Sequence, residues 1–145
     1  SGPLTGAVTG NVTGNVTGNA DTATTLQTAR SINGTSFNGS ADIVIGNIPQ
    51  NSQTSAYTLV VGDAGKHVNI TTGGVTVPSG VFSAGDAVSI FNDSASSQTI
   101  TQGSSVTLRL AGTANTGNRT LAQYGICTVL CVASNEFVIA GAGVS

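Results

Sequence analysis

The sequence predicts an all-β protein, and three observations support that prediction. Charged residues make up only 7% of the chain, while Gly alone contributes 20 residues. Thr, Ser, Asn, Val and Ala fill most of the remainder, and β-branched residues pack well on pleated surfaces. No window of useful length shows the i, i+3, i+4 apolar spacing of an amphipathic helix. We expect an extended β-fibre repeat and a short meander, followed by a compact β-sandwich or β-roll.

Residues 5–20 consist of four tetrapeptides, TGAV, TGNV, TGNV and TGNA. With the period of two that a strand imposes, one face carries only Gly, Val and Ala, and the other is almost wholly polar. A single ribbon of this kind has no partner for its apolar stripe or its backbone groups. Three copies around a common axis would supply both, so segment 4–24 is predicted to be a trimeric shaft; the alternative is a flexible linker. The predicted trimer contacts are Val8, Val12 and Val16.

Asn-Gly dipeptides occur at positions 33–34 and 38–39, and each is a strong two-residue hairpin signal. Residues 25–47 are therefore predicted to form a small β meander, which is too short to be stable without neighbouring chains. Its expected pieces run through Ile32, then Thr35–Phe37, then Ala41–Ile45. Residues 48–54 are predicted to be a connector, and residues 1–3 are compatible with an expression scar.

Residues 55–145 show short apolar runs separated by clusters of Gly, Asn, Asp and Ser, which is typical of a sandwich or roll. The run 126–133 is apolar on both faces apart from one threonine. It is either a central sandwich strand or a strand that another subunit covers on its second face. The expected strands are Ala56–Val61, His67–Thr71, Val75–Pro78, Ala87–Phe91, Thr99–Thr101, Val106–Ala111, Ile126–Ala133 and Phe137–Ala140.

Charge and hydropathy argue against two classes of partner. The net charge is −2 and the four cations are spread along the chain, so nucleic-acid binding is not expected. No run approaches 18 consecutive apolar residues, so membrane insertion is not expected either.

Cys127 and Cys131 would lie ~13 Å apart on one strand, beyond the reach of a disulfide. We interpret both as small buried hydrophobes, in agreement with assembly in a reducing cytoplasm.

Groups suited to catalysis are scarce. The six acids fall almost entirely at predicted turns, where Asp bonds to the local backbone. His67 is the one histidine, no Gly-x-Ser-x-Gly occurs, and two cysteines with one histidine make a poor zinc site. We expect no enzymatic activity, no metal and no cofactor. Phe82, Phe91 and Phe137 are predicted to lie in the core.

Four residues are candidates for receptor contact: Tyr124, Asn118, Arg119 and Arg109. The ring of Tyr124, beside Gly125, would suit stacking on a sugar; ordinary packing is the alternative. Arg119 either bonds to backbone carbonyls or a partner subunit, or contacts a receptor directly. Arg109 alternates with apolar residues, so it is expected to point to solvent or to a partner.

The central segment 19–43, NADTATTLQTARSINGTSFNGSADI, closely resembles the NADTATKLxTARxINGxxFxGSADI segments of bacteriophage tail fibres, including those of T-even-like phages. The TGNV repeat resembles shafts of marine and cyanobacterial phage fibres, and segments 117–125 and 140–145 are similar to fibre ends. The resemblance implies a homotrimer with the carboxy-terminal part as its tip, and residue 145 as the natural end. The His-x-His iron sites of some such fibres are not carried over, because His67 has no neighbouring histidine.

By this resemblance the protein is expected in the virion, in a phage tail assembled in the host cytoplasm and attached to other tail proteins upstream. Its expected function is host attachment through a bacterial surface receptor, a glycan or an outer-membrane protein. The alternative is a structural module that holds the trimer together and caps the shaft, with recognition located in another protein. Depolymerase activity is a third, disfavoured hypothesis.

Overall fold

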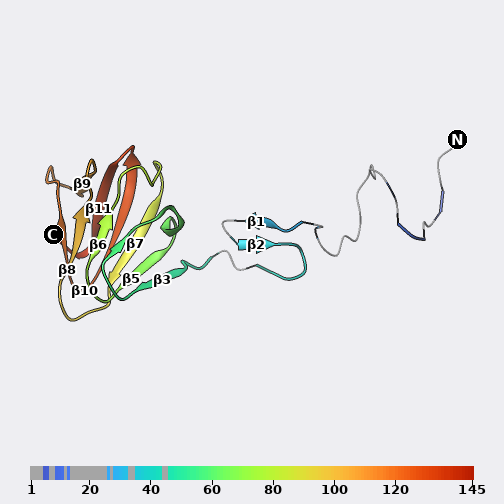
Figure 1. Ribbon diagram of the computed structural model, residues 1–145, viewed down its shortest axis with the longest axis horizontal. Coiled ribbons are helices and arrows are strands. Elements are labelled where there is room, and N and C mark those ends of the chain that lie inside the picture. Colours follow the sequence, from blue (N-terminus) through green and yellow to red (C-terminus); the bar gives the residue numbers. More distant parts are fainter. Residues whose placement is uncertain are drawn as a thin grey trace. The chain divides into compact units, whose positions relative to one another are not determined.

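The computed structural model describes residues 5–6, 9–11, 13, 26, 28–32, 35–43 and 46–145. The chain divides into two units, Ser1–Gly46 and Asn47–Ser145. Both contain strands, and one short 3-10 turn is the helical element among the described residues (Figure 1). The predicted all-β class is therefore confirmed.

The first unit contains one hairpin. Strand β1 (Arg30–Ile32) lies beside β2 (Thr35–Phe37) and pairs with it antiparallel (Figure 1). In this register Ile32 is opposite Thr35. The hairpin turn predicted at the first Asn-Gly dipeptide, positions 33–34, lies outside the described residues. The described part of the third expected piece, residues 41–43, forms no strand. At the second dipeptide, Asn38 Oδ1 accepts a hydrogen bond from the Ser40 N–H (3.0 Å), which makes a local side-chain turn instead of a hairpin.

The predicted shaft contacts Val8, Val12 and Val16 lie outside the described residues. The described residues of the repeat, 5–6, 9–11 and 13, form no strand in the single chain. None of the described residues of the first unit is buried, and Phe37 is half-buried. The hairpin therefore has little apolar burial of its own, and a two-stranded hairpin is at best marginally stable without further packing.

The second unit begins with three stacked coils, where one coil means a strand, a turn and the next strand in the sequence: β3 with β4, β5 with β6 and β7 with β8. Strands β3 (Gln50–Gln53), β5 (His67–Ile70) and β7 (Ala87–Asn92) pair in parallel. Strands β4 (Tyr57–Thr58), β6 (Val75–Val77) and β8 (Gln98–Gln102) also pair in parallel. The chain thus alternates between two groups of strands, which we call the β7 side and the β8 side. This arrangement is closer to the predicted roll than to an antiparallel sandwich.

A long ribbon joins the two sides. Strand β10 (Arg119–Ala133) first pairs antiparallel with β8, with Arg119 opposite Ile100. After an irregularity between Leu121 and Ile126, it pairs with β7 and with β11 (Glu136–Val144). Strand β9 (Thr107–Leu110) pairs in parallel with β11. The result is a nearly closed sheet whose path ends at β3 and β4 (Figure 1).

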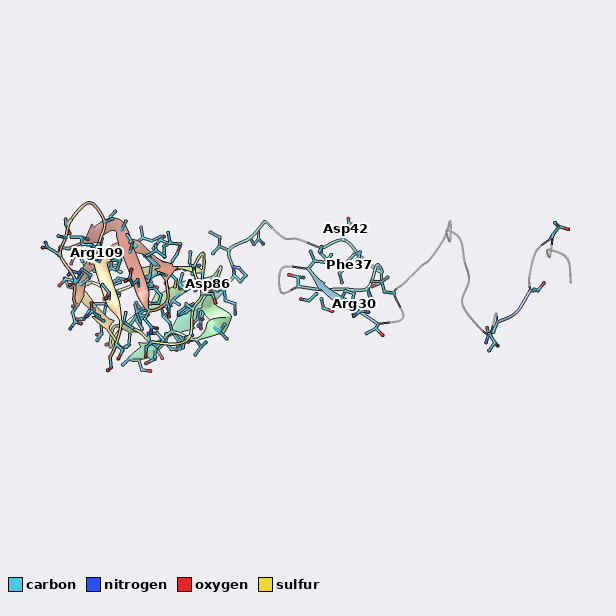
Figure 2. All side chains as sticks on the ribbon, turned by 90° about the horizontal axis from the view of Figure 1, so that it is seen from above. Arg30, Phe37, Asp42, Asp86 and Arg109 are labelled. Atoms are coloured by element: carbon cyan, nitrogen blue, oxygen red, sulfur yellow. The ribbon has the colours of Figure 1, made fainter. Side chains whose placement is uncertain are left out.

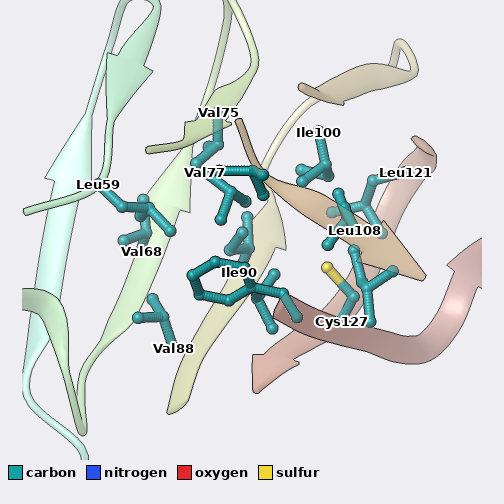
Figure 3. Packing of buried hydrophobic residues seen from close by; sticks show 14 of the residues in the cluster. Leu59, Val68, Val75, Val77, Val88, Ile90, Ile100, Leu108, Leu121 and Cys127 are labelled. Carbon is teal, nitrogen blue, oxygen red and sulfur yellow. The ribbon is translucent and has the colours of Figure 1, made fainter. Parts of the chain in front are cut away.

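The core lies between the two sides (Figure 3). Inward positions align from strand to strand, so that Val68 is opposite Ile90 and Ile90 is opposite Cys127. Phe82 and Phe137 pack edge to face with ring centroids 6.1 Å apart. Phe91 does not join them, because strict alternation in β7 buries Val88 and Ile90 and turns Phe91 to the outer face. The expectation that Phe91 is a core residue is therefore wrong.

The first coil carries polar side chains at several inward positions where the other coils are apolar, although Leu59, directly after β4, belongs to the core. The expected connector at 48–54 contains β3, whose inward Asn51 is opposite buried Val68 of β5. The expected strand Ala56–Val61 is shortened to β4 by a 3-10 turn, Val61–Asp63. Asp63 is 1% exposed and accepts hydrogen bonds from the Asn51 amide (2.7 Å), the Tyr57 hydroxyl (2.9 Å) and the Val60 N–H (2.9 Å). Burial, together with the bond to Asp63, raises the pKa of Tyr57. These bonds link the two edge strands through side chains and cap the open end of the stack.

Replacement of Asp63 tests this cap. Asp63→Ala leaves three donors without their acceptor, so we expect the free energy of unfolding to fall by about 2–4 kcal/mol. Urea denaturation followed by circular dichroism at one protein concentration measures it. Asp93→Ala is the matched control, because Asp93 is exposed and its carboxylate accepts a side-chain hydrogen bond only from the half-buried Asn69 amide (3.2 Å). An equal loss in both variants would contradict a special role for Asp63.

Both cysteines are free and buried, as the sequence predicts. Burial raises the pKa of the Cys127 thiol to about 12. Burial also raises the pKa of the Cys131 thiol, with a smaller contribution from the charge of Asp86. Since the thiolate is the reactive form, both groups are protected in the native chain.

A thiol-reactive reagent at pH 8 is expected to find no rapidly reacting cysteine in the native protein and two after denaturation. An unfolded thiol titrates near a pKa of about 8.5. Its folded pKa is raised, so its contribution to stability is complete below that pH and is lost as the pH rises further. The free energy of unfolding should therefore decline above about pH 8.5. Rapid native reaction would show that the strand containing these residues opens readily.

Candidate functional site

The turns that lead from the β7 side to the β8 side lie next to one another. They are segments 54–56, 71–74 and 93–97, followed by the corner 122–125 of β10, and we call them the turn row. Hydrogen bonds connect each segment to its neighbourhood: Thr71 N–H to Gln53 O (3.0 Å), Tyr57 N–H to Gly74 O (3.1 Å) and Tyr124 N–H to Ser94 O (3.2 Å). The turn row is therefore one continuous surface built on the ends of the strands.

Two buried amide side chains hold the turn row together. The Asn92 amide nitrogen lies within hydrogen-bond distance of the carbonyl oxygens of Ser96 (2.8 Å), Leu121 (3.1 Å) and Ala122 (2.8 Å). Gln98 Oε1 accepts from the Gly74 N–H (3.0 Å), and its nitrogen lies 3.2 Å from Ser94 Oγ. Asn92 is fully buried, so these bonds form in a low-dielectric environment where their loss is costly. The two residues tie segments 71–74 and 93–97 to the corner.

The corner is where β10 changes sides, and it requires close backbone approach. Gly125 is buried, and a Cβ at this position would lie 2.9 Å from the Ala122 carbonyl oxygen and 3.0 Å from that of Ala142. On the facing strand, Gly143 has φ +87°. Only glycine fits such contacts and such a backbone without strain.

Tyr124 stands at this corner with its side chain 60% exposed. Its φ is 54°, in the left-handed region, which is a genuine outlier for a bulky residue. Backbone strain of this kind persists only where surrounding structure enforces it, and it gathers at functional sites. An exposed aromatic ring held at a fixed angle is therefore the most distinctive feature of the turn row.

The rest of the turn row supplies neutral hydrogen-bonding groups. Its exposed polar residues are Thr54, Ser55, Thr72, Asp93, Ser96, Ser97 and Gln123. Hydroxyl and amide groups both donate and accept hydrogen bonds, and one carboxylate accepts. An aromatic face beside such groups suits a sugar, which presents C–H groups on one face and hydroxyls around its rim.

The other three candidate residues are located elsewhere, around the loop between β9 and β10. Asn118 Oδ1 accepts a hydrogen bond from the Gln102 N–H (2.9 Å). Arg119 is 9% exposed, and its Nε donates to the Gly117 carbonyl (3.2 Å), which matches the backbone-bonding alternative. Arg109 is exposed on β9, and its Nη1 lies 3.4 Å from the Ala114 carbonyl oxygen (Figure 2). Asn118 and Arg119 thus have structural bonds, and the structure does not bring Tyr124 together with these three.

One apolar hollow lies away from the turn row. Val60, Val61, Gly80 and Val81 line an open depression of about 440 Å³. None of these four side chains carries a polar group, so nothing there would orient a ligand.

Across the described ranges, which omit most of residues 1–27, no group of three His, Cys, Asp or Glu side chains is arranged to hold a metal ion. The same part of the chain contains no helix of sufficient length and apolar character to cross a membrane.

The sequence matches no known protein family and no curated protein. The site must therefore be interpreted from its own chemistry.

Sequence reasoning missed Asn92, Gln98 and Gln102, which organise the loops. Gln102 Oε1 accepts from the N–H groups of Leu108 (2.8 Å) and Gly117 (3.0 Å). The sequence did contain a signal for the role of Asn92, because the alternation that buries Val88 and Ile90 also places Asn92 on the inner face of β7. An amide on the inner face near a strand end must bond to backbone groups in the adjoining loop.

Two substitutions of Tyr124 separate backbone strain from side-chain function. Tyr124→Val places a β-branched residue in the left-handed region, so we expect the free energy of unfolding to fall by about 1–2 kcal/mol. Tyr124→Gly relieves the strain and should leave stability within about 1 kcal/mol of the wild type. Thermal unfolding measures both. Equal losses for Val and Gly would mean that the ring, and not the backbone, stabilises the corner.

Proposed function

We propose that this chain is the distal part of a trimeric bacteriophage tail fibre and attaches the virion to a glycan on the bacterial surface. The exposed, strained Tyr124 at the corner of β10 is the observation that carries this proposal. The resemblance of segment 19–43 to tail-fibre sequences supports the assignment to a phage tail. An outer-membrane protein is the other class of bacterial surface receptor that this chain could bind.

Binding at one turn row would be weak. A pair of packed aromatic rings contributes roughly 0.5–1.5 kcal/mol beyond its buried area, and we expect a similar contribution from Tyr124 stacked on a sugar. Three copies per fibre and several fibres per virion raise the overall avidity by orders of magnitude. Weak single sites also favour reversible sampling of a surface before firm attachment.

The function is proposed to be non-catalytic, and the environment of the acids supports this. Asp63 is engaged with Asn51, Tyr57 and Val60 at the polar cap, and Asp86 accepts from the Ser83 N–H (2.8 Å). Glycoside hydrolysis needs two carboxyl groups about 5–10 Å apart that face one substrate. The turn row contains a single acid, Asp93.

A structural module is the second candidate function. The exposed apolar residues Ile126, Leu130 and Val132 on the outer face of β10 favour it, because they suit contact between subunits. In that case the chain would hold the trimer together and another tail protein would recognise the host.

A glycan array tests receptor binding directly. The purified full-length chain is applied to immobilised lipopolysaccharide O-antigens and capsular polysaccharides of Gram-negative bacteria. We expect binding to at least one glycan, with about a tenfold loss of single-site affinity for Tyr124→Gly, which corresponds to about 1.4 kcal/mol. Because the sites act together in the assembled chain, the loss of overall binding on the array should be larger than tenfold.

Arg109→Ala is the comparison variant, because Arg109 is exposed but lies away from the turn row. Loss of binding in Arg109→Ala with retention in Tyr124→Gly would move the receptor site to the β9 loop. Failure of the wild-type chain on every glycan, while it remains assembled, would contradict a glycan receptor and leave an outer-membrane protein receptor and the structural module as the remaining candidates. Release of free sugar from any bound polysaccharide would contradict the non-catalytic assignment.

A further inference from the structure

The two outer faces of the second unit differ in chemistry. On the β8 side, outward positions are threonines that align across strands, with Thr58 opposite Thr76 and Thr76 opposite Thr101. On the β7 side, Phe91 is opposite Ile126 and Leu130 is opposite Val138. Ile126, Leu130 and Val132 are 50%, 39% and 45% exposed. The apolar patch consists of Phe91, Ile126, Leu130, Val132, Val138, Ala140 and Ala142, and it encloses one polar pair, Thr128 and Ser89, whose hydroxyls lie 3.3 Å apart.

The inner residues of β10 do not explain the apolar outer ones. Cys127, Val129 and Cys131 already fill the core positions of this strand. A strand with one solvated face normally carries polar residues on that face. The β8 side follows this rule, whereas Ile126, Leu130 and Val132 break it. The outer face of β10 therefore has the character of a covered surface.

The size of the patch limits what can cover it. Three strands about 4.8 Å apart over about seven residues give roughly 300 Å². Two such faces bury about 600 Å² in total, below the roughly 1,000 Å² expected of an independent specific interface. A freely diffusing partner would gain too little from this patch. A partner already held at millimolar effective concentration would gain enough.

The first unit supplies such a tether. Its two three-residue strands bury little within one chain, and Leu26 and Ile32 are 45% and 41% exposed. As a strand, the sequence of the repeat at 5–20 would place Gly, Val and Ala on one face and mostly Thr and Asn on the other. Association between copies of the chain would bury the apolar residues of the hairpin and of the repeat and would supply partners for their backbone groups. Because the second unit begins directly after the first, association of first units would hold second units close together.

We propose that the apolar patch on β7, β10 and β11 packs against the second unit of another copy of this chain. The bulky side chains of β10 then fit over the alanines of β11 in the neighbouring copy, and the threonine face looks outward. This inference rests on the trimeric assembly within the proposed function but is independent of receptor binding. Glycan binding and contact at the patch can therefore fail separately.

Site-directed cross-linking in the full-length chain tests the contact. Ala140 is exposed on the patch, and Thr99 is exposed on the outer face of the β8 side. With a short bismaleimide, Ala140→Cys should give cross-linked chains on a denaturing gel and Thr99→Cys should not. The native Cys127 and Cys131 are buried and should not react.

Leu130→Glu added to Ala140→Cys should abolish the cross-link, even if light scattering shows that first units still hold the chains together. Thr99→Glu added to the same background is the matched control and should leave the cross-link intact. Circular dichroism establishes that each variant remains folded, and if Leu130→Glu unfolds the chain, Val132→Lys takes its place.

Three results would overturn the proposal. They are a monomeric wild-type chain at micromolar concentration, equal cross-linking at positions 99 and 140, and an assembled chain without cross-linking at position 140.

Discussion

No coil of the second unit can bury its apolar side chains without the coil beside it, and the rest of the structure follows from this constraint. The middle coils have neighbours on both flanks and carry Val68, Ile70 and Ile90 inward. The first coil has one neighbour, so its inward positions carry Asn51 and Tyr57, joined by Asp63. At the other end, the β10–β11 ribbon closes the stack by pairing with strands of both sides. A purely apolar first coil would leave the core open to water at one end.

Much of the strand pattern could be predicted from the sequence, because apolar alternation survives wherever one face of a strand is buried. It located β5, β6, β7 and β9 to within one or two residues. It failed at β3, since the sequence QNSQ has no apolar alternation and only the register with β5 reveals it as a strand. It also extended β4 too far, because Val60 and Val61 are apolar yet exposed beside the buried carboxylate of Asp63.

Strand pairing and the site were harder to foresee. Parallel stacking of short strands depends on where each turn returns the chain, and turn composition does not encode that. Tyr124 could be nominated as an exposed ring from its neighbour Gly125, but its left-handed backbone results from β10 changing sides, a tertiary event. Arg119 was a candidate both for backbone bonding and for receptor contact, and in the structure its Nε donates to the Gly117 carbonyl two residues earlier. The buried amides escaped notice because Asn and Gln look like loop residues when only composition is considered.

The parallel pairing of β3 with β5 also determines how this unit would bear mechanical load. The chain enters at Gln50 and runs along β3 towards the turn row, where Tyr124 is exposed. A pull applied between the entry point and the turn row is directed along the strands. The four residue pairs between β3 and β5, from Gln50–His67 to Gln53–Ile70, are then loaded together in shear and do not open one after another. Bonds that share a force must break nearly simultaneously. The short edge strand β3 would therefore resist tension that is applied along the strands, from its first residue towards the turn row.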